Sequence, residues 1–275
     1  MDTIEEKYEK LLALFRSCSG AAVAFSGGVD STLLLRAAQD ALGDRTLAVT
    51  AVSEFFPERE RGEAAQFCRD NGIPYREFHF EALAVEGVRD NPPDRCYRCK
   101  RALFETIAGI AREQGLAVVV EGTNLDDRGD YRPGMRAVRE LGVLSPLCEA
   151  ELSKAEIREL SRRLGLPGWD KPSFACLASR LAYGETITLE KLRRVEQAED
   201  LLLAHGFRQL RVRVHGELAR IEVPPEEISR LAADGLRQTI YSGLRDLGFR
   251  YVTLDLGGYR TGSMNEALAR REDTP

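Results

Sequence analysis

The sequence has few features of a membrane protein, a secreted protein or a protein that coats nucleic acid. No apolar run approaches the roughly 20 residues of a membrane-spanning helix. Residues 1–12 are charged and amphipathic, unlike a signal peptide. Lysine and arginine (39) are outnumbered by aspartate and glutamate (44), and the net charge of −5 argues against broad contact with nucleic acid. We therefore expect a cytoplasmic protein without membrane or nucleic-acid partners.

Metal-ligand motifs are also sparse. The 275 residues include three histidines and six cysteines, with a single CxxC motif, whereas a closed zinc site usually needs four such ligands. Without a secretion signal, cysteines in a chain of this length indicate thiols, metal binding or catalysis more than disulfides. The hydrophobic fraction of 43% and the charged fraction of 30% are typical of one large or two modest globular domains.

A glycine-rich turn, Ser26–Ser31, follows the apolar run 21–25 and precedes a leucine-rich stretch. That order predicts a strand, a tight turn and a helix start. Glycine lets the backbone approach a ligand without a Cβ clash, and a helix start suits a phosphate through its unpaired N–H groups and dipole. The turn has no Walker lysine and lacks the third glycine of a dinucleotide site. Asp30 and Ser31 are candidates to cap the helix, and a plain strand–turn–helix link is the alternative.

Strand-like and helical patterns alternate over the first part of the chain, so we expect an α/β fold with a parallel, doubly wound sheet. Ligands of such sheets bind at the carboxyl ends of strands, where the glycine turn and Glu121–Asn124 fall. Residues 122–136 predict a polar loop that is long enough to be functional. The predicted strands are 21–25, 46–52, 75–80 and 117–121, and the predicted helices are 3–17, 31–42, 58–70, 100–114 and 153–164.

After about residue 185 the pattern changes to that of a small α+β domain. Residues 1–184 and 185–275 are therefore expected to form separate domains. The elements predicted for the second domain are a helix over 188–205, a hairpin of 208–214 and 218–223, a helical stretch at 225–235 and a strand near 250–256.

Three cysteines form a candidate metal or redox site. Cys96 and Cys99 make the CxxC, which on its own fits a redox pair, half of a zinc site or cluster ligands. Cys176 lies in another predicted loop, where Lys171 and Arg180 would favour its thiolate; its alternative is a small buried hydrophobe. Three thiolates would leave one iron of a four-iron cluster without a protein ligand. The other cysteines, Cys18, Cys68 and Cys148, are predicted to lie in the core.

Together these motifs resemble the LarE family of PP-loop sulfur transferases, which make the nickel-pincer cofactor of lactate racemase. The SGGxDS pattern of Ser26–Ser31 is similar to the signature of PP-loop ATP pyrophosphatases, which cleave ATP between the α- and β-phosphates. The resemblance extends over nearly the whole chain and implies a PP-loop ATP pyrophosphatase domain followed by a domain for substrate binding and oligomerisation. The other motifs that support the resemblance are Cys96–Lys100, Glu121–Asn124 with Asp126 and Asp127, Tyr131–Gly134, Lys171–Arg180, Arg211–His215 and Ala219–Glu222.

The resemblance implies that ATP, with Mg²⁺, adenylates a carboxylate of pyridinium-3,5-biscarboxylic acid mononucleotide and releases pyrophosphate. Sulfur then replaces the adenylate and leaves a thiocarboxylate. A carboxylate is a poor acyl donor because it is anionic and has no good leaving group. Adenylation supplies that leaving group, and a thiolate or sulfide is then a competent nucleophile. The amides of the glycine turn would hold the pyrophosphate while Mg²⁺ shares its charge.

The resemblance allows two sources of the sulfur. In one branch of the family, the cysteine that matches Cys176 surrenders its own sulfur and becomes dehydroalanine. In another branch, three cysteines arranged like Cys96, Cys99 and Cys176 hold an oxygen-sensitive [4Fe-4S] cluster that carries the transferred sulfide. This chain matches the three-cysteine pattern. We therefore expect the cluster as a cofactor, with sacrificial donation by Cys176 as the alternative.

The resemblance also implies roles for individual residues. Asp30 would place Mg²⁺, with helix capping as its alternative. Arg211 and Arg213 alternate along a predicted strand and share one face, which suits a phosphate; a solvated hairpin face is the alternative. The expected catalytic residues are Cys176, Asp30 and Glu199, the expected ATP ligands are Ser26, Gly27, Gly28, Asp30, Ser31, Gly122 and Thr123, and the expected substrate contacts are Tyr97 (stacked on the pyridinium ring), Ser179, Arg180, Arg211, Arg213 and Glu222.

Three other functions share part of this pattern. An amide-forming enzyme of the NAD synthetase kind would use ammonia and need no cysteine triad. A tRNA-thiolating enzyme would share the ATP and cluster chemistry but carry a clearer basic surface, and an ATP-sensing or assembly protein would bind ATP without turnover. We expect a small-molecule mononucleotide as substrate and a homo-oligomer. The sulfur source, the oligomer size and the occupancy of the cluster do not follow from the sequence.

Overall fold

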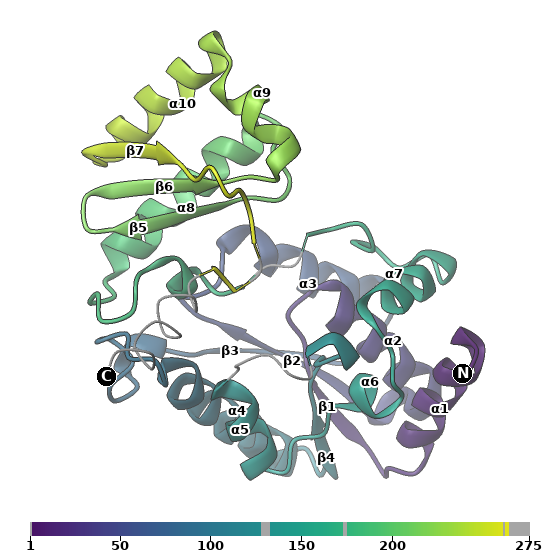
Figure 1. Cartoon of the computed structure of the whole chain (residues 1–275). Helices are drawn as coiled ribbons and strands as arrows, with labels where there is room; N and C mark the ends of the chain where they lie inside the picture. The colour runs from purple at the N-terminus through teal and green to yellow at the C-terminus, as the bar shows by residue number, and fades with distance from the viewer. Residues whose placement is uncertain (1, 128–132, 173–174, 261, 264–275) are drawn as a thin grey trace, which may run out of the picture. The chain divides into compact units, whose positions relative to one another are not determined.

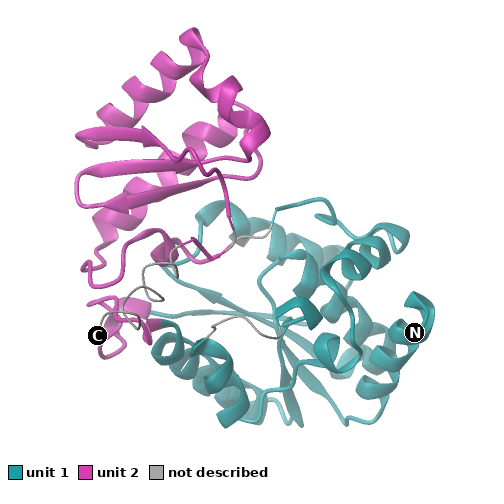
Figure 2. Ribbon diagram, in the orientation of Figure 1, with its two compact units in different colours: residues 1–81, 96–174 teal, residues 82–95, 175–275 magenta. Residues whose placement is uncertain are grey.

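Two compact units make up the computed structural model of the chain (Figure 2). Unit 1 comprises residues 1–81 and 96–174, and unit 2 comprises 82–95 and 175–275. The sequence pattern placed the boundary at 184/185, whereas the units divide at 174/175 and the short segment 82–95 belongs with unit 2. The structure describes residues 2–127, 133–172, 175–260 and 262–263, so four motif residues, Tyr131, Arg132, Ser173 and Phe174, lie outside the described residues.

Unit 1 is built on four parallel strands in the spatial order β3–β2–β1–β4. β1 (Ala21–Ala24) pairs with β2 (Thr46–Val52) and β4 (Val118–Val120), and β3 (Tyr75–His79) lies beside β2. Helices lie on both faces of this sheet (Figure 1), which confirms the predicted doubly wound α/β fold. They are α1 (Ile4–Arg16), α2 (Val29–Leu42), α3 (Glu58–Asp70), α4 (Arg95–Glu113), α5 (Pro133–Glu140), α6 (Pro146–Glu149) and α7 (Lys154–Arg163).

The central strand of unit 1 is buried on both faces. Ala21 and Val23 pack into one apolar cluster with Phe15 of α1. Ala22 packs into the other cluster, with Phe104 of α4. Successive side chains of a strand point to opposite faces, and a strand that is covered on both faces is apolar at every position. This burial explains the uninterrupted apolar run before the glycine turn.

Unit 2 contains three strands in the order β5–β6–β7. β5 (Arg211–His215) and β6 (Leu218–Glu222) form the predicted hairpin, and β7 (Tyr251–Leu254) pairs with β6 in parallel. The stretch predicted as helical at 225–235 is a 3-10 turn and a short helix. The extended backbone of Ala233 separates this short helix from α10 (Asp234–Asp246), a helix that the sequence pattern did not predict. The helices are α8 (Leu189–Ala204), α9 (Ile228–Ala232) and α10 (Asp234–Asp246).

Two element boundaries in unit 1 differ from the sequence prediction in ways that bear on the site. α4 begins at Arg95 rather than at residue 100, so the CxxC motif lies in its first turns. The loop predicted over 122–136 gives way to α5 at Pro133, because proline is favoured at a helix start, where its missing N–H has no intrahelical partner. Within the described part of the chain, no helix has the length and apolar character needed to cross a membrane.

Candidate active site

The glycine turn lies between β1 and α2, at the carboxyl end of the central strand. Gly27 has a φ of +75°, which a residue with a side chain rarely adopts. A Cβ placed on Gly28 would meet one atom within 4 Å, Ser26 Oγ at 3.4 Å, so the space over this residue is open. Ser31 Oγ donates to the Gly28 carbonyl at 3.0 Å and lies 3.1 Å from Ser26 Oγ. The hydrogen bonds of the two serines stabilise the turn, and the open space over Gly28 is available to a ligand.

Asp30 does not cap α2, so the helix-capping role that the sequence left open for Asp30 is wrong. The N-cap is Gly28, the helix begins at the next residue, and Asp30 and Ser31 both lie inside its first turn. The Asp30 carboxylate pairs instead with Lys154 Nζ and accepts a hydrogen bond of 3.3 Å from Asn124 Nδ2. Two groups that are distant in sequence therefore hold this carboxylate beside the glycine turn.

Lys154 is a residue of this site that the sequence did not single out. It is the first residue of α7, directly after Ser153, whose capping box with Glu156 fixes where the helix starts. Ser-x-x-Glu is a sequence signal for such a start, and the helix was predicted. The contact with Asp30 joins residues 124 positions apart, and no local pattern signals a contact of that range.

The loop after β4 packs against the start of α2. A Cβ on Gly122 would lie 3.2 Å from the backbone nitrogen of Ser31, so a larger residue would press on the helix start. The buried Glu121 accepts hydrogen bonds from the backbone nitrogen of Thr123 (3.1 Å) and from Ser145 Oγ (2.6 Å), which fixes the loop. The expected ATP ligands, Ser26, Gly27, Gly28, Asp30, Ser31, Gly122 and Thr123, thus all lie where the neighbouring parallel strands β1 and β4 end.

The CxxC motif occupies the N-terminal turns of α4, with the half-buried Cys96 and Cys99 three positions apart and on one side of the helix. Tyr97, between them, is already engaged. The Arg136 guanidinium lies 3.8 Å from the centre of its ring, and its hydroxyl donates to Glu140 at 2.6 Å. The aromatic ring that we expect to stack on a pyridinium cation therefore carries a cation from α5 in this structure.

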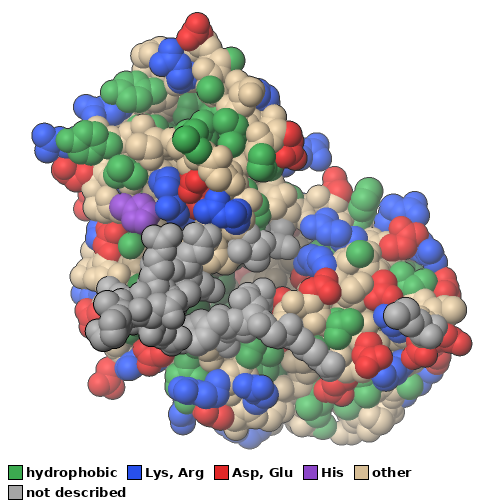
Figure 3. Space-filling model, in the orientation of Figure 1, with side chains coloured by type: hydrophobic (Ala, Val, Ile, Leu, Met, Phe, Trp, Pro, Cys, Tyr) green, Lys and Arg blue, Asp and Glu red, His purple; other side chains and the backbone are tan. Residues whose placement is uncertain are grey.

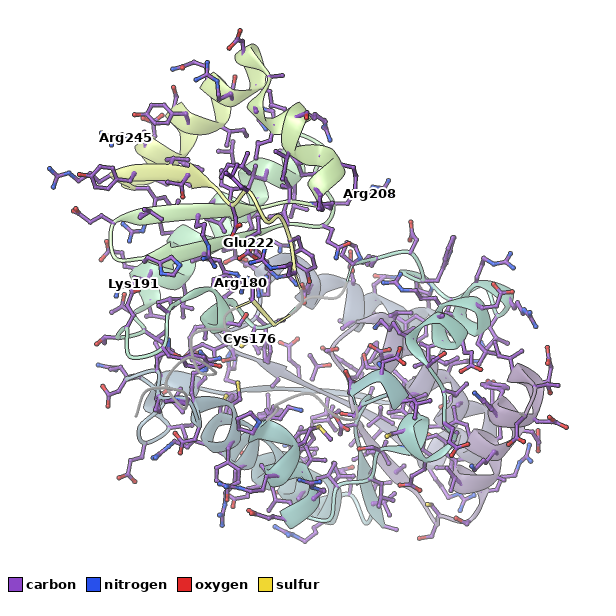
Figure 4. All side chains as sticks on the ribbon, in the orientation of Figure 1. Cys176, Arg180, Lys191, Arg208, Glu222 and Arg245 are labelled. Atoms are coloured by element: carbon purple, nitrogen blue, oxygen red, sulfur yellow. The ribbon has the colours of Figure 1, made fainter. Side chains whose placement is uncertain are left out.

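In unit 2, Arg180 organises the loop that carries Cys176 (Figure 4). Its side chain is fully buried, and Nε and Nη2 donate to the two carboxylate oxygens of Glu199 at 2.9 and 3.0 Å. Nη1 donates to the carbonyl oxygen of Cys176 at 3.0 Å and to Ser179 Oγ at 3.1 Å. A bidentate arginine–carboxylate pair has a planar, defined geometry. The pair therefore holds the backbone of this loop against α8.

The two arginines of β5 are buried, so the alternative of a solvated hairpin face is wrong. Arg211 and Arg213 are each 5% exposed. Arg213 donates to Glu222 from Nε and Nη2 at 3.1 and 3.0 Å and to the carbonyl oxygen of Ser179 at 3.0 Å. The pKa of Arg211 is lowered to about 10, mainly by burial and next by the positive charge of Arg180. Buried guanidinium groups that repel one another favour a bound anion.

Comparison with known proteins finds relatives over the full length of the chain, although no family model matches it. The chain is 38% identical over 273 residues to the pyridinium-3,5-bisthiocarboxylic acid mononucleotide synthase of Lactiplantibacillus plantarum, covering 99% of this chain and 98% of the relative. The chain belongs to the LarE family. An uncharacterized protein of Synechocystis sp. is 43% identical over 97% of this chain and 100% of the relative. One subunit of the glutamine-hydrolyzing GMP synthase of Archaeoglobus fulgidus is 31% identical over 54% of this chain and 51% of the relative.

The six cysteines of this LarE protein differ in environment. The CxxC motif belongs to unit 1 and Cys176 to unit 2. Cys68 is buried, and burial raises its pKa to about 12, as fits a core thiol. Cys18 and Cys148 are half-buried, so their predicted core placement is wrong. Among the residues that the structure describes, no disulfide forms, and no three His, Cys, Asp or Glu side chains make a group that could hold a metal ion.

Acid is expected to weaken unit 2 of this LarE protein through Glu199. Burial alone would raise the pKa of Glu199, but the charge and hydrogen bonds of Arg180 outweigh it, and the pKa is lowered from 4.5. A carboxyl group with a lowered pKa stabilises the fold above its unfolded-state pKa. That stability is lost as the pH falls through the folded-state value. Glu199→Gln should therefore lower the free energy of unfolding by about 3 kcal/mol near neutral pH, because breaking a buried pair leaves Arg180 uncompensated.

The difference between Glu199→Gln and the wild type should shrink once the pH is well below 4.5, because the wild-type carboxyl is then protonated as well. Chemical denaturation of both proteins at neutral and acidic pH measures this difference. Glu190→Gln, an exposed position on the same helix, is the control. A difference that stays constant with pH would mean that the Glu199 charge does not stabilise unit 2.

Proposed function

We propose that the chain is an ATP-dependent sulfur transferase in the synthesis of the nickel-pincer cofactor of lactate racemase. It adenylates a carboxylate of pyridinium-3,5-biscarboxylic acid mononucleotide, releases pyrophosphate and converts the carboxylate to a thiocarboxylate. The observation that carries the proposal is the 38% identity, over 99% of the chain, to a relative that is named for the synthesis of the bisthiocarboxylic acid mononucleotide.

The ATP-dependent step is assigned to unit 1. The glycine turn, with open space over Gly28, would hold the departing pyrophosphate on backbone N–H groups. The carboxylate of Asp30 is partly exposed and offers the oxygen ligands that Mg²⁺ prefers. Mg²⁺, when bound, shares the negative charge of the phosphates. The substrate carboxylate attacks the α-phosphorus, and the bond from that phosphorus to the oxygen that bridges the α- and β-phosphates breaks. Pyrophosphate departs, and the product is an acyl adenylate.

The mononucleotide phosphate is assigned to the buried arginines of unit 2. Burial and the charge of Arg180 lower the pKa of Arg211, and a bound anion would favour the charged form of both groups. Arg213 adjoins Arg180 at Ser179, because Arg213 donates to the carbonyl oxygen of Ser179 and Arg180 donates to its Oγ. The resemblance implies a catalytic role for Glu199. This residue is buried, and both of its carboxylate oxygens accept hydrogen bonds from Arg180. We therefore assign Glu199 to positioning Arg180.

The sulfur step is assigned to Cys96, Cys99 and Cys176. Cys96 and Cys99 lie on one side of α4 and fit two thiolate ligands of an iron–sulfur cluster, with Cys176 as the proposed third. The cluster, when bound, supplies the sulfide that is transferred. Whichever sulfur attacks, a carbon–sulfur bond forms while the bond from the acyl carbon to the AMP oxygen breaks, so AMP leaves. Sacrificial donation by Cys176 is the alternative source.

The charge distribution favours a small substrate over a tRNA. The net charge is −5, and Figure 3 shows acidic and basic side chains interspersed over the face of unit 1 that it draws. An RNA-binding surface is typically a basic patch or stripe. A tRNA that accepts sulfur in place of the mononucleotide would contradict the proposed substrate.

Product analysis tests the function. Anaerobically purified protein with ATP, Mg²⁺ and the biscarboxylate mononucleotide should yield AMP, pyrophosphate and the thiocarboxylate, and the protein should contain iron and acid-labile sulfide. Release of ADP and phosphate would contradict cleavage between the α- and β-phosphates. An amide formed with ammonia would indicate an enzyme of the NAD synthetase kind, and ATP binding without turnover would indicate a sensing or assembly protein.

Arg211→Gln is expected to weaken binding of the mononucleotide by roughly 10- to 100-fold, because a lost charge-assisted hydrogen bond costs about 1.5–3 kcal/mol. ATP affinity should be nearly unchanged. Substitution of Arg211 tests substrate binding more clearly than substitution of Arg213, because removing Arg213 would take a partner from the buried Glu222. Calorimetric titration with each ligand measures the effect, with the exposed Arg208→Gln as control. Equal loss of both ligands would mean that Arg211 is structural.

A further inference from the structure

A buried asparagine and a buried arginine connect the short segment 82–95 to the rest of unit 2. Asn91 is 0% exposed and Arg95 is 3% exposed. The Nδ2 group of Asn91 donates to the carbonyl oxygens of Leu181 at 3.3 Å and Ala182 at 2.7 Å. These contacts explain why the segment belongs with unit 2 although the chain on both sides of it belongs with unit 1.

The backbone of Asn91 has a conformation that its contacts must hold in place. Its φ is +51°, a value that residues with a side chain rarely adopt, although asparagine does so more often than most. The Oδ1 atom of Asn91 accepts a hydrogen bond from Nη1 of Arg95 at 2.5 Å. One amide side chain therefore orients a buried guanidinium group with its oxygen while its nitrogen is bonded to the backbone of the loop.

Arg95 contacts the loop that carries Cys176 and directly precedes the CxxC motif. Its Nη1 group donates to the carbonyl oxygen of Ala178 at 2.9 Å, and Ala178 lies in the 3-10 turn Leu177–Arg180 that begins just after Cys176. Arg95 is also the first residue of α4, so Cys96 is the next residue of the chain. One buried side chain is thus hydrogen-bonded to the loop of one cysteine and belongs to the residue before another.

We propose that Arg95, oriented by Asn91, is a positioning residue for sulfur transfer, because it holds the loop of Cys176 in the arrangement that the transfer requires. Hydrogen bonds from a charged donor are stronger than those between neutral groups, and a misplacement of about 1 Å can slow a reaction by on the order of 100-fold. The role is the same whether Cys176 is a cluster ligand or the sulfur donor. This inference rests on the proposed function, because it requires that Cys176 takes part in the sulfur step.

Single-turnover assays of Arg95→Met, at saturating ATP and biscarboxylate mononucleotide, test the inference on two half-reactions. Formation of the thiocarboxylate should slow by roughly 10- to 100-fold, while release of pyrophosphate should be nearly unchanged. Arg95→Lys keeps the positive charge and should recover part of the lost rate. Asn91→Gly suits the positive φ without strain and removes the same contacts, so it should also slow only the sulfur step. A purely structural role would slow both half-reactions alike.

Hydrogen exchange of the free protein gives a readout that does not depend on activity. The backbone amides of residues 177–182 should exchange faster in Arg95→Met than in the wild type, because their loop loses its bond to the guanidinium group. Arg194→Met is the matched control, since Arg194 lies on α8 of unit 2 and also donates to a backbone carbonyl, that of Gly248 at 3.3 Å. It should leave both half-reactions and the exchange of this loop unchanged.

The outcomes separate this inference from the proposed function. An active wild type with unchanged thiocarboxylate formation, or with unchanged exchange of residues 177–182, in Arg95→Met would overturn the role of Arg95 alone. Equal losses in the two half-reactions, or an equal loss of sulfur transfer in Arg194→Met, would overturn it as well. A wild-type protein that forms no thiocarboxylate would overturn both the proposed function and this inference.

Discussion

Gly28→Val is expected to lower ATP cleavage by roughly 100-fold or more, the loss typical when a transition-state contact to a developing anion is removed. A Cβ at this position meets only one atom within 4 Å, so the valine side chain would occupy the open space where the phosphates are proposed to approach. The φ of −75° suits any residue. The expected cost to the fold is therefore only that of a poor N-cap, about 1 kcal/mol. Release of AMP and pyrophosphate, together with thermal unfolding, measures the two effects.

Gly109→Val is the control for this prediction, because a Cβ there meets no atom within 4 Å and Gly109 lies in α4, outside the glycine turn. It should cleave ATP like the wild type. Unchanged turnover in Gly28→Val would mean that the phosphates do not approach this edge of the sheet. Equal loss of activity in both variants would indicate a general effect on unit 1.

Cys96→Ala and Cys99→Ala are each expected to abolish sulfur transfer and to remove iron from the anaerobically purified protein. The reason is that the two cysteines proposed as ligands of one cluster lie on the same side of α4, and thiolates are the usual ligands of iron–sulfur clusters. Cys18→Ala, at a half-buried cysteine of unit 1 outside the motif, should retain both iron and activity. Iron and sulfide assays with single-turnover measurement of the thiocarboxylate give the result.

Sacrificial donation predicts the opposite behaviour of the CxxC motif. In that route Cys96→Ala and Cys99→Ala transfer sulfur like the wild type, and intact mass shows dehydroalanine at position 176 after one turnover. Either finding would refute the cluster route. Cys176→Ala is expected to be inactive in both routes, so this variant serves only to confirm that Cys176 is required.

Many elements of the fold were predictable because their signals are local. The apolar run of β1 arises from burial on both faces of the sheet. The start of α7 follows from the capping box of Ser153 and Glu156. The hairpin turn of unit 2 lies at His215-Gly216-Glu217, where Gly216 has a φ of +60°. By contrast, α10 was missed because its start depends on one extended residue, Ala233, which no strong local signal marks.

The sequence by itself determined the membership in the LarE family, the glycine turn between a strand and a helix, and the CxxC motif. Each of these depends on residues that are close together in the chain or on similarity along its whole length. Only the tertiary structure decided that Asp30 pairs with Lys154, that Arg180 is buried against Glu199, and that Arg136 covers the ring of Tyr97. Burial and charge pairing depend on which segments the fold brings together, and residues distant in sequence become neighbours only when the chain packs.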